Sequence, residues 1–299
     1  MSCHIVHINS FLDCERVMTQ RAADVLVVPM LNGFACEIRG IDATAPMEDA
    51  AFARIEQAFD RFGVLFLRRQ NVTPLEQVAF SRRFGEVEVN FNSDRFGLAD
   101  VPEIFAIGNA TRAGEAIALK GVGQTWHSDM CYAANPPRAT MLFAVEVPQL
   151  HGLPLGDTCF ANAAAAWDAL PEAMQNYVDG RQATFDFRGR QRARPVPPET
   201  VAQYPPVQHP MVRRHPRTGR KSLYVMRDDC TAIEGCTERE AKRLINALAE
   251  HILRPEFTYR HRWQAGDLLL WDNCTVQHRA LNDYEAPERR LMHRSTIAG

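Results

Sequence analysis

The sequence predicts a mainly β protein with flanking helices, in the α+β class. Three features support this prediction: many short apolar strand-like runs, few amphipathic helical segments, and long polar loops between them. With 299 residues and 46% hydrophobic content, the chain can bury a sizeable core. No internal repeat or clear linker is visible. We therefore expect a weakly patterned N-terminal extension (1–26) and a single domain (27–299), a β-sandwich or barrel covered by helices.

The first part of the domain combines a hairpin, two helices and a strand. Residues 25–42 alternate apolar and polar side chains, which predicts a hairpin. Residues 48–63 have apolar side chains at helical spacing and end on a glycine, which favours a helix, and 64–68 read as a buried strand. Residues 73–85 predict a second helix, because Thr73 and the glutamate three residues later form a capping box.

Beyond residue 88, strand-like runs alternate with long loops. The expected strands are 104–107, 125–132, 139–147, 222–226, 267–272 and 290–297. The expected helices are 163–178, which Pro171 can split into two pieces, and 237–252. The segments 107–124 and 186–210 have no periodicity, and loops of such length in a compact domain are more often functional than structural.

Composition excludes several classes of protein. The net charge of −2 and the pI near 6.6 argue against nucleic-acid and membrane-surface partners. The eight cysteines are scattered, without a C-x-x-C pair, so we expect reduced thiols in a cytoplasmic protein. Neither a signal peptide nor an apolar run of membrane length is evident. We further expect a homo-oligomer that acts on a small molecule.

The segment TWHSDMCY, residues 125–132, carries an imidazole and a carboxylate two residues apart. In a strand, His127 and Asp129 would project to the same face. On its own this pair has two readings: Asp129 orients a structural histidine, or both bind a metal. His278, after the strand-like run 267–272, supplies a third candidate. Two histidines and one carboxylate would occupy one face of a ferrous ion and leave adjacent positions open.

The last expected strand adds two cations. Arg290 and Arg294 share a face with Met292. Two inward guanidinium groups are costly unless each meets an anion. The alternative is an edge strand on which both arginines are solvated.

Taken together, these residues resemble the taurine dioxygenase / 2,4-dichlorophenoxyacetate dioxygenase family of non-haem iron(II), 2-oxoglutarate-dependent enzymes. The resemblance runs from about residue 27 to the end of the chain. It rests on WHSD (126–129), GDT (156–158), HPRTGRKSLYV (215–225), GDLLLWDN (266–273), His278 and ERRLMHRSTI (288–297).

The resemblance implies a double-stranded β-helix (jelly roll) and a set of site roles. His127, Asp129 and His278 would bind Fe(II). Arg290 and Thr158 would bind the distal carboxylate of the 2-oxoglutarate cosubstrate. Together with O2, the enzyme would hydroxylate a small organic substrate and release succinate and CO2.

The resemblance leaves the substrate open. Arg294 would face the substrate or help to hold the cosubstrate, and it suggests an anion. Taurine-type enzymes have a sulfonate-binding histidine near the position of Asn90, which is neutral here. Taurine therefore becomes a weaker candidate than an aryloxyalkanoate or a sulfate ester.

Two other functions fit part of the pattern. A zinc-dependent hydrolase could use the same triad, but Arg290 and Thr158 would then have no role. A non-catalytic jelly-roll binding protein could hold an anionic effector with its arginines, but it would not need all three metal-binding residues.

Overall fold

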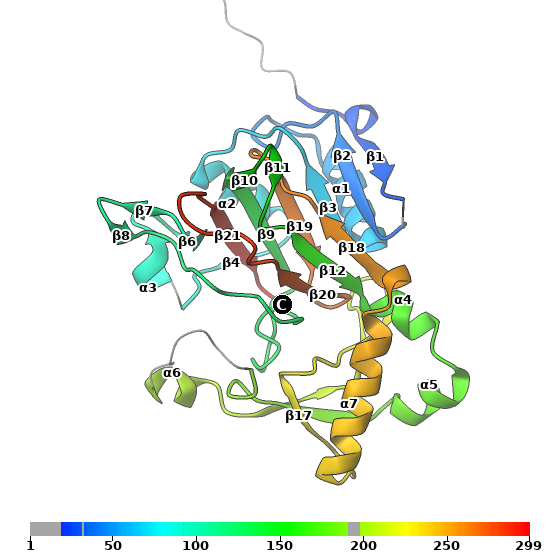
Figure 1. The fold of residues 1–299 in the computed structure, drawn as a ribbon. Coiled ribbons are helices and arrows are strands. Elements are labelled where there is room, and N and C mark those ends of the chain that lie inside the picture. Colours follow the sequence, from blue (N-terminus) through cyan, green and yellow to red (C-terminus); the bar gives the residue numbers. More distant parts are fainter. Residues whose placement is uncertain (1–18, 32, 92, 191–197) are drawn as a thin grey trace, which may run out of the picture.

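The computed structural model describes residues 19–31, 33–91, 93–190 and 198–299. Its main feature is a large sheet in the order β1-β2-β3-β19-β9-β21-β6-β5, with β4 also paired to β21 (Figure 1). The strands are β1 (Leu26–Pro29), β2 (Ala35–Arg39), β3 (Val64–Leu67), β4 (Val87–Glu88), β5 (Gly97–Leu98), β6 (Val101–Gly108), β9 (Ala139–Glu146), β19 (Leu268–Asp272) and β21 (Leu291–Ile297). The predicted mainly β class with flanking helices is confirmed.

A smaller sheet has the order β18-β12-β20. Its strands are β18 (Thr258–His261), β12 (Thr158–Asn162) and β20 (Val276–Ala280). One buried cluster joins the two sheets, because it contains Leu142 and Trp271 of the large sheet together with Phe160 and Val276 of the small one. The two sheets therefore face each other across a shared core.

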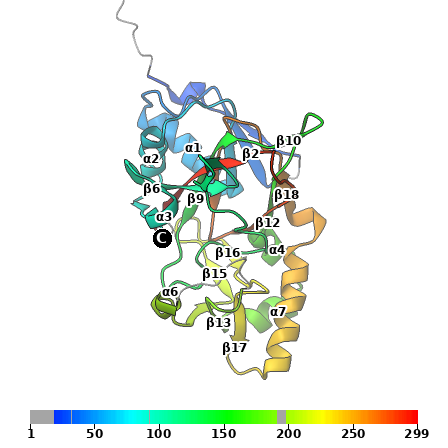
Figure 2. The ribbon, with the colours of Figure 1, turned by 60° about the vertical axis from the view of Figure 1, so that its left-hand side comes forward.

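Two helices cover the other face of the large sheet, as Figure 2 shows: α1 (Asp49–Phe62) and α2 (Pro74–Arg82). Along β19, Leu268 and Leu270 pack toward the helices, whereas Leu269 and Trp271 pack toward the small sheet. This alternation follows from the two-residue period of a strand. A strand buried on both faces explains the continuous apolar run in the sequence.

The predicted C-terminal end of α1 and the predicted N-terminal cap of α2 are confirmed, whereas α2 ends at Arg82, before the predicted residue 85. α1 ends at Gly63, which adopts the left-handed conformation with φ 70°. At the start of α2, the Thr73 side chain accepts from the backbone of Glu76, and the Glu76 side chain accepts in return from Thr73. The hairpin predicted within residues 25–42 is also confirmed, since β1 and β2 pair antiparallel.

A third cluster lies beneath the sheets, around the long helix α7 (Glu238–Ile252) (Figure 1). Its other elements are α4 (Ala163–Asp168), α5 (Glu172–Val178), β13 (Gln182–Phe185), β14 (Val207–Pro210), β15 (Val212–Arg214), β16 (Lys221–Leu223) and β17 (Cys230–Ile233). The predicted split at Pro171 is confirmed, because α4 and α5 flank it. The expected strand 222–226 is shorter than predicted: β16 ends at Leu223, and the Val225 carbonyl instead accepts from the Gln277 side chain.

The remaining elements are short. They are η1 (Ala22–Asp24), α3 (Ser93–Phe96), β7 (Thr111–Arg112), β8 (Glu115–Ala116), β10 (Gln149–Leu150), β11 (Leu153–Pro154), α6 (Pro198–Gln203) and η2 (Pro255–Phe257). The segment 107–124, expected to lack regular structure, contains the β7–β8 hairpin. Of the other expected loop, residues 191–197 lie outside the described residues. None of the described helices is both long and apolar enough to cross a membrane.

Residues 1–18 of the expected N-terminal extension also lie outside the described residues. Within the rest of that segment, Val25 is buried in the cluster under α1. The division into an extension and a single domain stays a prediction.

Candidate metal centre

Two histidines far apart in the sequence are neighbours in the backbone ladder. His127 N donates to His278 O at 3.0 Å, and His278 N donates to His127 O at 2.8 Å. His278 belongs to β20, whereas His127 forms an isolated antiparallel bridge beside it. Their rings lie 4.1 Å apart between centroids. The backbone thus places both imidazoles at one edge of the small sheet.

The predicted strand 125–132 is wrong. Only His127 makes a β-bridge, and the chain then turns through Asp129 to Tyr132, with Met130 at φ 44°. A positive φ at a non-glycine residue breaks the strand geometry on which the same-face argument relied. Asp129 nevertheless approaches the imidazoles, because the turn brings its carboxylate back toward them.

The three side chains converge. Asp129 Oδ1 lies 3.7 Å from His127 Nε2 and 3.8 Å from His278 Nε2. All three potential ligand atoms lie within 4.8 Å of one another. In the part of the chain that the structure describes, this is the one group of three or more His, Cys, Asp and Glu side chains with such spacing. All three residues are buried.

The imidazole of His127 offers the lone pair of its Nε2. His127 Nδ1 lies 2.8 Å from Thr125 O, and a carbonyl can only accept, so the ring proton sits on Nδ1. For His278, burial and then the nearby His127 hold the pKa well below its usual value. His278 is therefore neutral, which is the form that binds metal ions.

Asp129 is anionic. Burial alone would raise its pKa, but Arg294 and the two histidines hold that pKa well below the usual value. Its Oδ2 accepts from Thr140 Oγ1 at 2.6 Å, and its Oδ1 lies 3.0 Å from Arg294 Nη2. A buried carboxylate beside two imidazoles is a donor set suited to a divalent transition metal.

Arg290 is the second inward guanidinium. It is 2% exposed, and its Nε has no hydrogen-bond partner among the described residues. Its backbone N donates to Asn109 Oδ1 at 2.8 Å, and a Cβ added to Gly156 would lie only 2.9 Å from its Nε. Burial, opposed by Tyr284, lowers the pKa of Arg290. A desolvated cation with an unpaired donor favours an anionic ligand.

Arg290 is therefore buried, and Arg294 is largely buried with 12% of its side chain exposed, which fits the expected inward-facing pair. The alternative of a solvated edge strand is wrong, because β21 pairs with β9 on one side and β6 on the other. Arg294 Nε also has no hydrogen-bond partner among the described residues. These two unpaired donors fit a ligand that carries anionic oxygens, as 2-oxoglutarate does.

Thr158 begins β12 and is buried. Its Oγ1 accepts from Trp263 Nε1 at 3.0 Å. An indole nitrogen can only donate, so the hydroxyl proton of Thr158 remains available to another acceptor. The residue before Thr158 in the sequence is Asp157, whose negative charge acts to raise the pKa of Arg290. The place of Thr158 beside Arg290 stays a prediction.

Asn90 follows β4 and is buried, with its main-chain oxygen accepting from Ser93 N at 2.8 Å. β4 pairs with the far end of β21, at Thr296 and Ile297. The substrate role of Asn90 stays a prediction.

The arginines at positions 188, 190, 192 and 194 form a basic run, which the sequence pattern alone favours as a solvated loop. Arg188 is exposed and pairs with Asp186, whereas Arg190 is buried in an ion pair with Asp229 at 2.6 Å. Arg190 also lies 3.9 Å from the buried thiol of Cys131. The solvated reading is therefore wrong for Arg190, because Asp229 compensates its charge. Arg192 and Arg194 lie outside the described residues.

Two site residues were missed in the sequence analysis. Thr140 hydrogen-bonds Asp129, and Asn273 hydrogen-bonds Thr140. The available signal was a polar side chain inside the otherwise apolar run 139–145. A hydroxyl at a fully buried strand position needs a partner.

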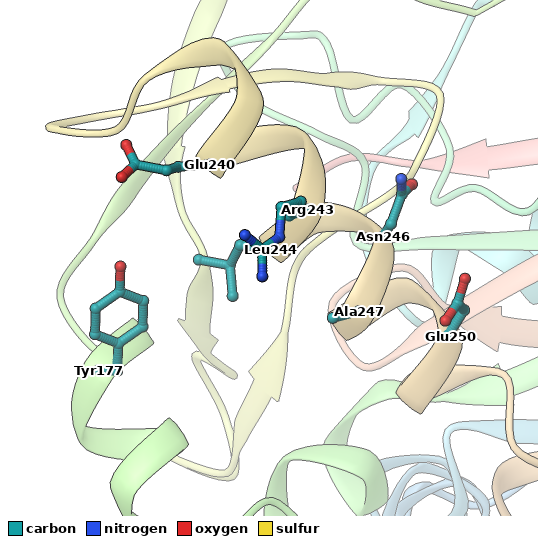
Figure 3. Close-up of a pocket in the computed structure, with 7 residues that line it drawn as sticks. All are labelled: Tyr177, Glu240, Arg243, Leu244, Asn246, Ala247 and Glu250. Atoms are coloured by element: carbon teal, nitrogen blue, oxygen red, sulfur yellow. The ribbon is translucent and has the colours of Figure 1, made fainter.

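A surface hollow lies elsewhere, along α7 (Figure 3). It is lined by Tyr177 of α5 and by residues of α7, including Glu240 and Arg243. None of the predicted site residues lines it. It is therefore separate from the candidate metal centre.

A mainly β fold with two histidines and one aspartate at a buried site is typical of mononuclear metal oxygenases, and fold and site together define that class. The chain belongs to the Taurine catabolism dioxygenase TauD, TfdA family, whose model matches residues 27–296. It is accordingly a 2-oxoglutarate-dependent dioxygenase. Family membership therefore favours the dioxygenase over the two alternatives expected from the sequence, a zinc-dependent hydrolase and a non-catalytic binding protein.

Relatives with assigned activities cover nearly the whole chain. The alpha-ketoglutarate-dependent 2,4-dichlorophenoxyacetate dioxygenase of Cupriavidus pinatubonensis is 34% identical, over 91% of this chain and 97% of its own length. The alpha-ketoglutarate-dependent sulfate ester dioxygenase of Pseudomonas putida is 30% identical, over 93% and 91%. Both matches cover more than nine tenths of this chain.

Solved structures give the same result. A taurine dioxygenase from Burkholderia xenovorans superimposes with a TM-score of 0.78 at 32% identity, covering 92% of this chain and 90% of that one. AAD-2 in complex with Mn(II) and N-oxalylglycine has a TM-score of 0.77 at 27% identity, covering 92% and 97%. N-oxalylglycine has the two carboxylates of 2-oxoglutarate.

Proposed function

We propose that His127, Asp129 and His278 bind Fe(II), and that the enzyme uses 2-oxoglutarate and O2 to hydroxylate a small organic anion, releasing succinate and CO2. When bound, the iron supplies the activation of O2. The observation that carries the proposal is the convergence of one carboxylate oxygen and two imidazole nitrogens within 4.8 Å of one another. Imidazole and carboxylate ligands with open positions suit non-haem Fe(II).

The oxoacid site is proposed at Arg290 and Thr158. A carboxylate there would receive a bidentate pair from the guanidinium and a hydrogen bond from the hydroxyl. Burial of Arg290 excludes water from this pair and makes it stronger. The backbone hydrogen bond to Asn109 and the close packing of Gly156 fix the arginine before any ligand arrives.

For the primary substrate we propose an aryloxyalkanoate or a related aryl anion, with Arg294 as the partner of its charge and Asn90 nearby. A cluster of aromatic side chains supports an aryl group in the substrate. The ring centroid of Tyr132 lies 4.7 Å from that of Phe187 and 5.2 Å from that of Tyr204. The ring of Phe91 lies 5.9 Å from that of Tyr204. Tyr132 is only three residues after Asp129. Sulfate esters, and less so taurine, are the alternatives.

We further propose that the two facing sheets form the double-stranded β-helix of this family, within the single domain 27–299. Antiparallel pairing of β12 with β18 and β20, opposite a larger sheet, supports this arrangement. A homo-oligomer in the cytoplasm stays a prediction, which light scattering of the purified protein and cell fractionation would test.

Anaerobic titration of the metal-free protein with Fe(II) and 2-oxoglutarate tests the reaction class. The wild type should develop the weak visible charge-transfer band of the chelate, and His127→Ala should abolish it. An exposed histidine outside the site, His151, gives the matched control: His151→Ala should keep the band. A wild type without a band would contradict the proposal.

A panel of acids tests the substrate class. Aryloxyalkanoates, alkyl sulfates, taurine and neutral or cationic analogues are each supplied with 2-oxoglutarate, and substrate-dependent succinate is measured. We expect coupling with aryl anions first. Coupling restricted to neutral or cationic compounds would exclude the anionic class.

A further inference from the structure

We propose that Thr140 is a positioning residue for the metal centre: its hydroxyl holds Oδ2 of Asp129 so that only Oδ1 is presented to the metal. This inference rests on the metal-binding role proposed above for Asp129. It assigns a function to the side chain of the second residue of β9.

The contact between the two residues is short and buried. Thr140 Oγ1 lies 2.6 Å from Asp129 Oδ2, and Thr140 has no exposed surface. Thr140 sits in β9 between β19 and β21, in register with Trp271 and Thr296. A central strand fixes its Cβ direction, so the hydroxyl has little freedom.

The direction of the hydroxyl proton follows from the other partners of Thr140. Asn273 Nδ2 lies 3.2 Å from Oγ1, and Arg294 Nη2 lies 3.4 Å from it. Both groups are donors, and they occupy the two acceptor positions of the oxygen. The single proton must therefore point to Asp129 Oδ2. Such a hydrogen bond to a carboxylate is charge-assisted and roughly twice as strong as a neutral one.

The amide orientation of Asn273 is fixed in turn. Trp271 Nε1 donates to Asn273 Oδ1 at 3.0 Å, and the backbone N of Asp129 lies 3.4 Å from the same oxygen. Since an indole can only donate, Oδ1 must face it, and Nδ2 must face Thr140. A chain of donors thus runs from Trp271 through Asn273 and Thr140 to Asp129.

The consequence concerns the number of oxygens that Asp129 offers. Oδ1 lies 3.7 and 3.8 Å from the two imidazole Nε2 atoms and 3.0 Å from Arg294 Nη2, whereas Oδ2 accepts the hydrogen bond from Thr140. A carboxylate held in this way binds through one oxygen. One-oxygen binding leaves three coordination positions for the oxoacid and O2, while two-oxygen binding would block one of them.

The test uses Mn(II) alone as the probe, with the free ion followed by electron paramagnetic resonance in the absence of 2-oxoglutarate. Removal of an outer partner of a metal ligand typically weakens metal binding roughly 10- to 100-fold. We expect Thr140→Val, which keeps the side-chain shape, to weaken Mn(II) binding by that amount. Thr140→Ser keeps the hydroxyl and should bind Mn(II) about as tightly as the wild type.

Thr296 gives a matched control. It lies directly opposite Thr140 on β21, and its Oγ1 is buried with no hydrogen-bond partner among the described residues. Thr296→Val makes the same chemical change in the same sheet, and it should leave the Mn(II) dissociation constant unchanged. Should Thr140→Val fail to fold, Thr140→Ala removes the hydroxyl without adding a methyl group and carries the same expectation.

The outcomes separate this inference from the function on which it rests. A wild type that binds no Mn(II) overturns the metal role of Asp129, and the inference falls with it. A wild type that binds Mn(II) as tightly as Thr140→Val overturns the inference alone. A lower unfolding temperature of Thr140→Val with unchanged Mn(II) binding also overturns it, because the hydroxyl would then be merely structural.

Discussion

Arg294 Nη2 lies 3.0 Å from Asp129 Oδ1, the same carboxylate oxygen that faces both imidazoles. Both side chains are almost fully buried, so the pair stands in a medium of low dielectric constant. The arginine keeps Asp129 anionic despite its burial. The site therefore carries its own compensating cation beside the position proposed for the metal.

Replacement of this cation should destabilise the metal-free protein. Arg294→Gln leaves a buried carboxylate without its partner, and breaking such a pair costs about 3 kcal/mol of unfolding free energy. Urea denaturation of the metal-free proteins measures this loss. Saturating Mn(II) should restore most of it, because the ion supplies the missing positive charge.

The matched control for both arginines of the site is Arg289→Gln. Arg289 is exposed and pairs with Glu146 at 2.8 Å, and such surface pairs contribute little. If Arg294→Gln were as stable as Arg289→Gln without metal, the charge of Asp129 would not depend on Arg294.

Arg290→Gln should act on the cosubstrate. It removes a buried, bidentate donor to the proposed oxoacid carboxylate, and charge-assisted hydrogen bonds of this kind contribute about 1.5–3 kcal/mol. We expect KM for 2-oxoglutarate to rise roughly 10- to 100-fold, with a smaller change in kcat. Steady-state succinate formation over a series of oxoacid concentrations measures both. An unchanged KM, equal to that of Arg289→Gln, would place the oxoacid elsewhere.

Trp263→Phe tests the orientation of Thr158. The substitution removes the Nε1 donor that lies 3.0 Å from Thr158 Oγ1, while keeping an aromatic ring in the core. Thr158 could then turn its proton away from the oxoacid. The net value of one hydrogen bond is about 1 kcal/mol, so KM for 2-oxoglutarate should rise about fivefold. A larger effect on kcat than on KM would argue against this role.

Stability should fall on mild acidification. Burial lowers the pKa of His209, His261 and His293 below the usual value. The unfolded chain takes up protons at these residues near pH 6.5, and the folded protein only at lower pH. Between the pKa values of the unfolded and folded states, the unfolded chain binds more protons than the folded protein. A drop in pH therefore stabilises the unfolded state relative to the folded state.

We therefore expect the unfolding free energy of the metal-free protein to decrease from about pH 7.5 to about pH 5.5. Urea denaturation across this range measures it. His293→Gln should flatten the pH dependence, because it removes one of the titrating groups. A wild type that becomes more stable over the same range would contradict the assignment.

Much of the fold was predictable from local chemistry. The capping box at Thr73 and the glycine at position 63 define helix ends through contacts within a few residues, and both appear as expected. The apolar runs that form β9 and β19 were also recognisable, since central strands are buried on both faces.

The candidate metal residues were predictable by type but not by local geometry. His127, Asp129 and His278 were identified as a set, yet the strand that was to carry the first two is a turn. The positive φ of Met130 and the pairing of His127 with a distant strand depend on tertiary structure. Period-two patterns contain no information about either.

The residues that contact the candidate metal-binding residues were harder still to predict from the sequence. Thr140 stood out only as a polar residue in an apolar run, and its partners come from β21 and from the turn after β19. Likewise, Arg190 looked like one member of a basic loop, because its partner Asp229 is distant in sequence. Such pairings arise from packing between elements, which single-sequence patterns do not encode.

The two backbone hydrogen bonds between His127 and His278 have a thermodynamic consequence. The main chain brings these imidazoles together during folding, so the conformational entropy of joining two remote segments is lost before any ion arrives. Metal association then needs only side-chain adjustment and desolvation of the ion. Loading of the protein should accordingly be fast and should proceed without refolding of the sheet.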